Sequence, residues 1–297
     1  EALAYAHKQG VLHRDVKPQN IYLGERPTDG PWLIDFGLAR MRTLCDRRAN
    51  TGLCGTPGFI APEVITSMGE DVDHRADIFA LGCVLYGLLA KEPPFRRGDL
   101  PATSSRPSIS RTLLNTLRSQ TLPLTEAAPN APEALRRICE RAMAHELQDR
   151  YQDAGEMARD LRRFLLELDQ QEAETMLAQA RERLERRPQN ELAELETLDE
   201  VRTLADSARS LAEDARRRAE DGPDLADEAS RHAIDEVKRH AVKLVEETQR
   251  LKQQIVASQA QARRQLHAAG EDATAGQFRT ALAAARSSVL ERAGWDV

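Results

Sequence analysis

The sequence predicts a mainly α-helical protein, in which a helical part with one short β-hairpin precedes an all-α region of long, coiled-coil-like helices. Three observations support this fold class. The composition changes abruptly near residue 165, apolar residues beyond that point recur at steps of three and four, and two short apolar runs near the start flank a turn-rich segment. The 297 residues are enough for two domains, since a domain takes roughly 150 residues.

The change in composition suggests where one domain ends. All but two of the 14 prolines lie at or before Pro132, and all 4 cysteines and all 4 tyrosines precede residue 165. The remainder is rich in Ala, Glu, Arg, Leu and Gln, which are strong helix formers. We therefore expect a first domain over residues 1–165 and a helical domain over residues 166–297.

The first part combines strand and helix signals. The runs Ile21-Tyr-Leu and Trp32-Leu-Ile are strand-like and are joined by the turn-rich GERPTDG, which predicts a small hairpin. The apolar run Ile78 to Ala90 is too short to cross a bilayer, which takes about 20 residues, and suits a buried core helix. We expect no membrane segment within this chain. Because the chain begins at Glu1 rather than Met, a targeting segment outside it stays an open question.

The second part carries a narrow apolar stripe, which we call the seam. Alternating steps of three and four place its residues along one face of each helix, as in a coiled coil. The seam consists of Leu198, Val201, Ala205, Ala208, Ala212, Ala215 and Ala219, followed by Ile234, Val237, Ala241, Leu244, Thr248, Leu251, Ile255, Ser258 and Ala262. Many of these side chains are small, so the pattern fits both close antiparallel packing within one chain and a homodimer.

Helix breakers divide this second part. Pro188 and the pair Gly222-Pro223 interrupt the periodic pattern. They predict three long helices and a shorter fourth one, over residues 156–187, 190–221, 224–269 and 274–293.

Charge and cysteine content exclude some classes of function. A formal net charge of -6 argues against a nucleic-acid-binding protein, which usually carries a basic face. The 4 cysteines show no CxxC spacing of the kind that zinc sites use. Reduced thiols are typical of cytosolic proteins, so we expect a cytoplasmic location.

The residues that could carry out chemistry follow one another in a fixed order along the chain. They are His13-Arg14-Asp15-Val16-Lys17-Pro18-Gln19-Asn20, Asp35-Phe36-Gly37, Gly55-Thr56-Pro57, Ala61-Pro62-Glu63, Asp77 and Arg150. This series resembles the signature of the eukaryotic-type, or Hanks-type, serine/threonine protein kinases. The resemblance covers residues 1–165, implies the C-terminal lobe of a kinase domain, and is closest in character to bacterial members.

The resemblance implies a phosphoryl-transfer site with ATP and Mg²⁺ as cofactors. Asp15 would accept the proton of a Ser or Thr hydroxyl on a protein substrate, and Lys17 would place a cation near the transferred phosphoryl group. Asn20 and Asp35 would supply oxygen ligands, which Mg²⁺ prefers. Thr56 would contact both Asp15 and Lys17.

Other residues of the series would have structural roles in such a kinase. Phe36 would pack in the core and set the position of Asp35, and Asp77 would hydrogen-bond the backbone of the catalytic loop. Glu63 and Arg150 would form a buried ion pair. The full structural set is His13, Phe36, Gly37, Glu63, Asp77 and Arg150.

A regulatory site is also implied. Arg14 directly before Asp15 is typical of kinases that are switched by phosphorylation of the activation loop, because an arginine can pair with a phosphate. Thr51 is the first candidate acceptor and Thr43 the second.

One part of a kinase has no counterpart in these residues. A glycine-rich phosphate loop, a strand lysine and its partner glutamate precede the catalytic loop in this family, but only twelve residues precede His13. We therefore expect residues 1–297 by themselves to be inactive. The alternative is a non-catalytic, kinase-like scaffold with a helical interaction module. The helical region would act as a homodimer interface or bind a partner protein.

Overall fold

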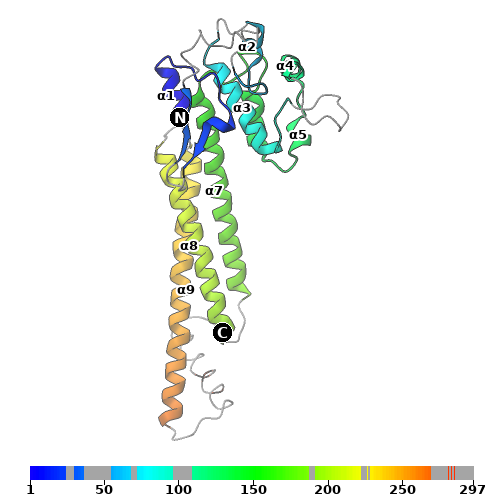
Figure 1. The fold of residues 1–297 in the computed structure, drawn as a ribbon. Helices are drawn as coiled ribbons and strands as arrows, with labels where there is room; N and C mark the ends of the chain where they lie inside the picture. The colour runs from blue at the N-terminus through cyan, green and yellow to red at the C-terminus, as the bar shows by residue number, and fades with distance from the viewer. Residues whose placement is uncertain are drawn as a thin grey trace. The chain divides into compact units, whose positions relative to one another are not determined.

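The computed structural model describes residues 1–24, 30–36, 55–67, 72–95, 109–186, 191–221, 226 and 228–268, together with positions 280, 282 and 284. The chain divides into two compact units, Glu1–Phe164 and Leu165–Val297. The helices and the single hairpin of the described residues are drawn in Figure 1. They confirm the mainly α-helical fold class.

The described part of the first unit consists of helices and one hairpin. In chain order they are α1 (Ala2–Lys8), a 3₁₀ turn (Pro18–Asn20), β1 (Ile21–Leu23), β2 (Pro31–Leu33), α2 (Pro62–Thr66), α3 (Arg75–Ala90), α4 (Ile109–Leu117), α5 (Leu124–Ala127), α6 (Glu133–Ala142) and the start of α7 (Ala154–Glu185). The strands are antiparallel, with Tyr22 opposite Trp32. The hairpin forms where the sequence predicts it, shifted by one residue at the second strand.

The apolar run of the sequence is the central helix α3. Its buried residues lie on all sides of the helix, which suits an element enclosed by others. The helix ends at Ala90, and the next residue, Lys91, adopts the left-handed backbone conformation with φ 60°. Pro93 and Pro94, which cannot continue a helix, follow it.

Close packing of α3 against α6 depends on Gly82. A Cβ atom at this position would lie 2.8 Å from Cγ of Met143 and 2.9 Å from Cβ of Ala142. We expect Gly82→Ala to destabilise the protein by about 1 kcal/mol, because overpacking costs about 1–3 kcal/mol and better helix propensity returns about 1 kcal/mol.

A matched control, Gly87, lies five residues further along the same helix. A Cβ at Gly87 would meet only the carbonyl oxygen of Glu92, at 4.0 Å. Gly87→Ala should therefore stabilise the protein by up to about 1 kcal/mol. Urea unfolding of the two variants checks this pair of predictions. Equal changes of the same sign in the free energy of unfolding would contradict the packing argument.

Three long helices form the described core of the second unit. They are the later part of α7, then α8 (Glu191–Asp221) and α9 (Glu228–Ala268). These bounds match the three predicted long helices to within about four residues. The predicted helix over 274–293 falls mostly outside the described residues.

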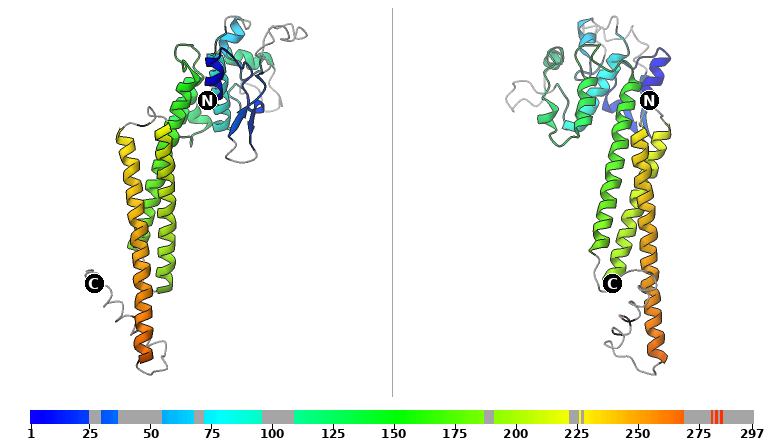
Figure 2. Two further views of the ribbon diagram at one scale, coloured as in Figure 1. Left: turned by 90° about the vertical axis from the view of Figure 1, so that its left-hand side faces the viewer. Right: turned by 180° about the vertical axis from the view of Figure 1, so that it is seen from behind.

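The seam is covered within the chain. Every seam residue of α8 and α9 is buried, including the polar Thr248 and Ser258. These two hydroxyls donate to carbonyls of their own helix, at Val245 and Gln254. Figure 2 shows α8 and α9 side by side from two directions. The small seam residues allow this close approach, so a second copy could reach the seam only if α8 and α9 separated.

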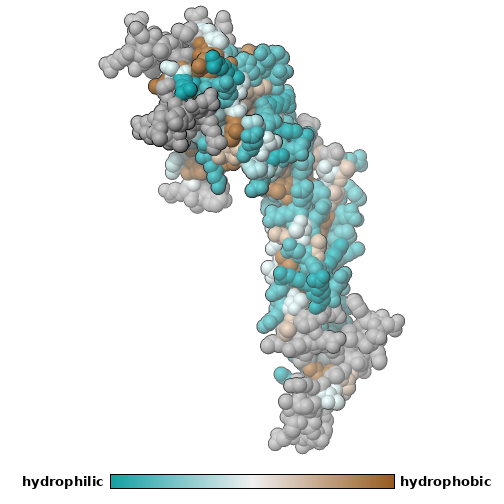
Figure 3. Space-filling model, turned by 90° about the vertical axis from the view of Figure 1, so that its right-hand side faces the viewer, coloured by the Kyte–Doolittle hydropathy of each residue, from teal (hydrophilic) through white to brown (hydrophobic). Residues whose placement is uncertain are grey.

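Ion pairs fix the register of the antiparallel helices. Three pairs join α8 to α9, namely Arg216 with Asp235, Glu213 with Lys238, and Asp199 with Lys252. The residue numbers of each pair add up to the same value, as an antiparallel pair without a register shift requires. Because these side chains are partly exposed, the pairs specify alignment more than they add stability. Hydrophilic residues cover much of the visible surface of these helices (Figure 3).

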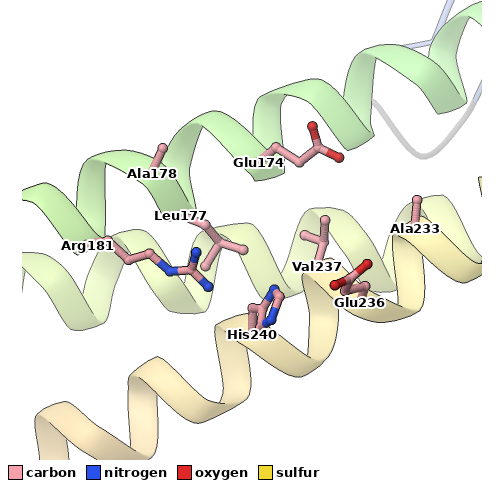
Figure 4. Close-up of a pocket in the computed structure, with 8 residues that line it drawn as sticks. All are labelled: Glu174, Leu177, Ala178, Arg181, Ala233, Glu236, Val237 and His240. Carbon is pink, nitrogen blue, oxygen red and sulfur yellow. The ribbon is translucent and has the colours of Figure 1, made fainter.

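A groove of about 290 Å³ lies between α7 and α9. Its lining combines Leu177 and Val237, which are buried, with the charged Glu174 and Arg181 (Figure 4). The groove marks where α7 packs less closely than α8 does against α9.

Two further findings bear on the expectations from composition. Cys83 and Cys139 are buried free thiols, and burial raises the pKa of the Cys139 thiol to about 12. Burial and the neighbouring Cys139 also raise the pKa of Cys83, so both thiols are poor nucleophiles at neutral pH. Among the helices that the structure describes, none combines the length and the apolar character needed to span a bilayer.

Candidate phosphoryl-transfer site

The predicted catalytic loop runs from the end of α1 to β1. His13 and Val16 are fully buried and anchor it in the core, and Asp15 between them is also buried. The 3₁₀ turn Pro18–Asn20 leads directly into β1. A buried anchor on each side therefore holds the short segment that carries the candidate catalytic carboxylate.

Asp77 holds the backbone of this loop. The N–H groups of His13 and Arg14 donate to its two carboxylate oxygens at 2.8 and 2.7 Å. Arg14 has φ 65°, a left-handed conformation that is unfavourable for a side-chain-bearing residue and persists only where its surroundings impose it. The two hydrogen bonds from one carboxylate supply that constraint at the residue directly before Asp15.

Asp15, Lys17 and Thr56 form a closed triangle of polar contacts. Nζ of Lys17 lies 2.6 Å from Oδ2 of Asp15 and 3.0 Å from Oγ1 of Thr56. The Thr56 hydroxyl donates to Oδ1 of Asp15 at 2.7 Å. Both oxygens of the carboxylate are therefore engaged, which fixes its orientation and brings residues 15, 17 and 56 together across the fold.

The hairpin brings Asp35 close to Asn20. The amide nitrogen of Asn20 donates to the carbonyl oxygen of Asp15 at 2.8 Å. The backbone N–H of Ile34 donates to the carbonyl oxygen of Asn20 at 2.9 Å, which extends the β1–β2 pairing by one residue. Asp35 follows directly and is exposed, with φ 63°. Sequence separation alone would not place these two side chains in one region.

His13 and Phe36 pack against each other next to this hairpin. Their ring centroids are 4.6 Å apart. His13 also lies within hydrogen-bond distance of Ile34, with Nε2 at 2.9 Å from the carbonyl oxygen, and its Nδ1 accepts the N–H of Asp15 at 3.3 Å. The carbonyl can only accept, so Nε2 carries the proton. The ring thus ties the strand before Asp35 to the loop that carries Asp15.

A buried ion pair joins α2 to the segment before α7. The guanidinium of Arg150 contacts Glu63 in a bidentate arrangement at 2.7 and 2.8 Å. Its remaining N–H groups donate to the carbonyl oxygens of Ala144, Arg75 and His145. All five donors of this fully buried side chain are satisfied, and its planar group also lies over the ring of Phe79 at 4.8 Å.

The donor set suits Mg²⁺ that is bound together with a nucleotide. Among the described residues, no cluster of three or more His, Cys, Asp or Glu side chains could hold a metal ion unaided. Asn20 and the exposed Asp35 offer one amide oxygen and one carboxylate. Mg²⁺ is usually held by one or two carboxylates and by substrate phosphates, so these residues fit the ion in that setting.

Three predicted residues lie outside the described part of the chain. They are Gly37, Thr43 and Thr51. Arg14 is described, and its Nε atom is buried without a hydrogen-bond partner among the described residues.

The sequence interpretation did not identify His7 as part of this site. Nε2 of His7 lies 2.8 Å from Oδ2 of Asp77, the carboxylate that holds the catalytic loop. A signal was present, because Leu3, Ala6 and His7 are spaced as one face of a helix and the first two are apolar. A histidine on the buried face of α1 needs a polar partner, but only the fold shows which one it has.

Comparisons with known proteins match the part of the chain that carries this site. Residues 1–177 match the family model described as the protein kinase domain. The chain is 35% identical over 168 residues to a probable serine/threonine-protein kinase PknB of Bifidobacterium longum, over 55% of this chain and 22% of that protein. It is 34% identical over 164 residues to PknB of Mycobacterium leprae, over 54% and 24% of the two chains. It is 35% identical over 182 residues to PknH of Mycobacterium tuberculosis strain H37Rv, over 61% and 27%.

The chain thus spans about a quarter of the length of the curated relatives that it matches. The family match covers more than half of the chain and includes the catalytic loop, the hairpin and the Glu63–Arg150 pair. The chain belongs to the protein kinase family, among the eukaryotic-type serine/threonine kinases of the kind found in bacteria.

Proposed function

We propose that residues 1–165 carry the catalytic loop of a kinase that transfers the γ-phosphoryl group of ATP to Ser or Thr residues of a protein substrate. The observation that carries the proposal is the Asp15–Lys17–Thr56 triangle, placed next to the hairpin that leads to Asp35. A structural ion pair would not need a threonine and a lysine on separate segments to orient one carboxylate.

The residues divide the chemistry between them. Asp15 orients the substrate hydroxyl and accepts its proton, because its carboxylate is fixed and its immediate partners are donors. Lys17 places a positive charge beside the reacting groups, where negative charge is redistributed during transfer. Asn20 and Asp35 would hold Mg²⁺, which would neutralise charge on the phosphates.

The exposed side of the hairpin supports a nucleotide site there. Tyr22 and Trp32 are opposite each other in the register and both are more than half exposed. Ile34, on the same side of the strand as Trp32, is 44% exposed. An apolar, aromatic surface next to Asn20 would pack against a nucleobase or another part of a kinase domain. We propose that residues 1–297 by themselves are inactive, because ATP binding in this family also uses the glycine loop and strand lysine.

A regulatory role for Arg14 is part of the proposal. Its Nε is buried and has no hydrogen-bond partner among the residues that the structure describes, and it is a charged donor suited to a phosphate. Thr51 and then Thr43 would be the acceptors on the activation loop. The helical residues 166–297 would bind a protein partner on surfaces other than the covered seam.

Phosphoryl transfer tests the proposed function. The assay measures transfer of labelled phosphate from Mg-ATP to a generic Ser/Thr substrate, for residues 1–297 and for any longer product that the same reading frame encodes. In the active form, Asp15→Asn should lower the rate by roughly 10²–10⁴-fold, the contribution of a positioned general base. Asp153→Asn, an exposed change that keeps an oxygen acceptor for the helix cap, is the control.

The outcomes distinguish the kinase proposal from the alternative of a non-catalytic scaffold. Activity of residues 1–297 that is lost in Asp15→Asn would retain the kinase proposal and refute the proposed inactivity of this chain. The non-catalytic scaffold would be favoured by two results together for a longer product. It would transfer no phosphate, and Mg-ATP would cause no thermal shift of the kind that Asp35→Ala removes.

A further inference from the structure

The groove between α7 and α9 has an acidic end and a basic end. On α7, Glu174 lies at the acidic end, and Arg181 lies two turns later at the basic end, roughly 10 Å further along the helix axis. On α9, Glu236 lies beside the acidic end and His240 lies beside the basic end (Figure 4). Both helices therefore place an acidic residue before a basic one along the groove.

These four side chains have no ionic partner among the residues that the structure describes. Glu174 accepts one hydrogen bond, from the side-chain amide of Gln170 at 3.0 Å. Elsewhere on the same helices, charged side chains pair within the chain, as Arg183 does with Glu200. The groove thus presents charged groups that are available to a binding partner.

The face of α7 beside the groove has a shape and a charge order that fit the groove itself. Ala178 is exposed on this face, between Glu174 and Arg181. Because alanine is small, a helix that presents this face can come close to the base of the groove, where Leu177 and Val237 are buried. A second copy of the chain would bring just such a face.

We propose that the groove is a homodimer interface and that α7 of a second copy, running antiparallel, occupies it. In this arrangement the second copy's Arg181 lies between Glu174 and Glu236. The second copy's Glu174 lies near Arg181 and His240. A two-fold axis at the middle of the groove relates the copies, so each contact occurs twice. A parallel second copy would set acid against acid and base against base, which electrostatic repulsion disfavours.

This surface can be reached without opening the helical unit. Every seam residue of α8 and α9 is buried, so the seam is closed to a second copy. By contrast, Glu174, Ala178 and Arg181 are all exposed. The groove lies within the second unit, so dimerisation through it is independent of the proposed phosphoryl transfer.

Charge reversal tests the proposal by sedimentation equilibrium of residues 1–297. Glu174→Arg leaves two arginines on the inserted face and Arg181→Glu leaves two glutamates, so neither variant complements itself. We expect each change to raise the dissociation constant of the dimer at least roughly tenfold, because like charges then face each other in both halves of the interface. An equal mixture of the two variants should associate again, because the face with two arginines complements the face with two glutamates.

Glu172→Arg is the matched control. It makes the same change of charge two residues before Glu174, at an exposed position on the opposite side of α7, and should leave the dissociation constant unchanged. A wild-type chain that stays monomeric up to its solubility limit would overturn the proposal. A mixture of Glu174→Arg and Arg181→Glu that associates no better than the separate variants would also overturn it, because the occupant would then not be α7 of a second copy. Circular dichroism should give the same helix content for every variant, so that lost association is not lost folding.

Discussion

Glu63→Ala is expected to destabilise the first unit by about 3 kcal/mol. Breaking a buried ion pair costs about 3–5 kcal/mol because one charge stays behind without compensation. Arg150 is fully buried and would lose two of its five hydrogen bonds. The lower end of the range applies because Glu63 is 20% exposed and already gains some solvation in the folded state.

A double variant separates the ion pair from simple loss of packing. Glu63→Ala combined with Arg150→Met removes both charges, so it should be less destabilised than the sum of the two single variants. Calorimetric unfolding checks this. Strict additivity of the two single changes would show that the pair is not coupled.

The surface pair of Glu133 and Arg137 provides a matched control. These side chains are both 72% exposed and their nearest charged atoms are 3.8 Å apart. Glu133→Ala should change the stability by less than about 0.5 kcal/mol, as exposed pairs contribute little. A loss comparable to that of Glu63→Ala would mean that burial is not the deciding factor.

The second large effect is expected for Asp77→Ala, which should cost about 2–4 kcal/mol. The N–H groups of His13 and Arg14 would both lose their acceptor, and each unsatisfied buried group costs about 1–3 kcal/mol. The Arg14 N–H is only partly buried, which keeps the total below the upper limit. The loop would also lose the constraint that offsets the strained conformation at Arg14.

A graded substitution tests this assignment. Asp77→Asn keeps the size of the side chain but has one acceptor oxygen instead of two, so it can satisfy only one of the two backbone groups. Its stability should therefore lie between that of the wild type and that of Asp77→Ala. The amides of His13 and Arg14 should be the first whose hydrogen exchange changes. Urea unfolding followed by circular dichroism provides the stability values. If Asp77→Asn were as stable as the wild type, the loop would not require two simultaneous backbone hydrogen bonds to residue 77.

Local signals account for most of the elements that the sequence predicted. The bounds of α7, α8 and α9 follow from residue spacing and from helix breakers at Pro188 and Gly222-Pro223, which act within a few residues of where they stand. The hairpin was predicted from two short apolar runs around turn residues, and the observed register pairs Tyr22 with Trp32. Propensity and periodicity are sufficient in these cases because the determining contacts lie close together in the sequence.

The candidate site was predictable only as a set of residue types. The order of Asp15, Lys17, Asn20 and Asp35 along the chain suggested phosphoryl transfer through a family resemblance, and the family match agrees. The sequence could not supply the contact of Thr56 with both Asp15 and Lys17 from physical principles alone, because those residues are about 40 positions apart. His7 was missed for the same reason, since its partner lies 70 residues away.

By itself, the sequence determined that the chain is mainly helical, that it belongs to the kinase family and where its long helices lie. Only the tertiary structure decided how the seam is used, because small residues at steps of three and four fit intrachain and intermolecular partners equally well. The antiparallel ion pairs between α8 and α9, together with the burial of every seam residue, assign the seam to contacts within the chain. The tertiary structure also brought His7 to Asp77, since which polar groups meet in a core depends on packing between distant segments and not on local preference.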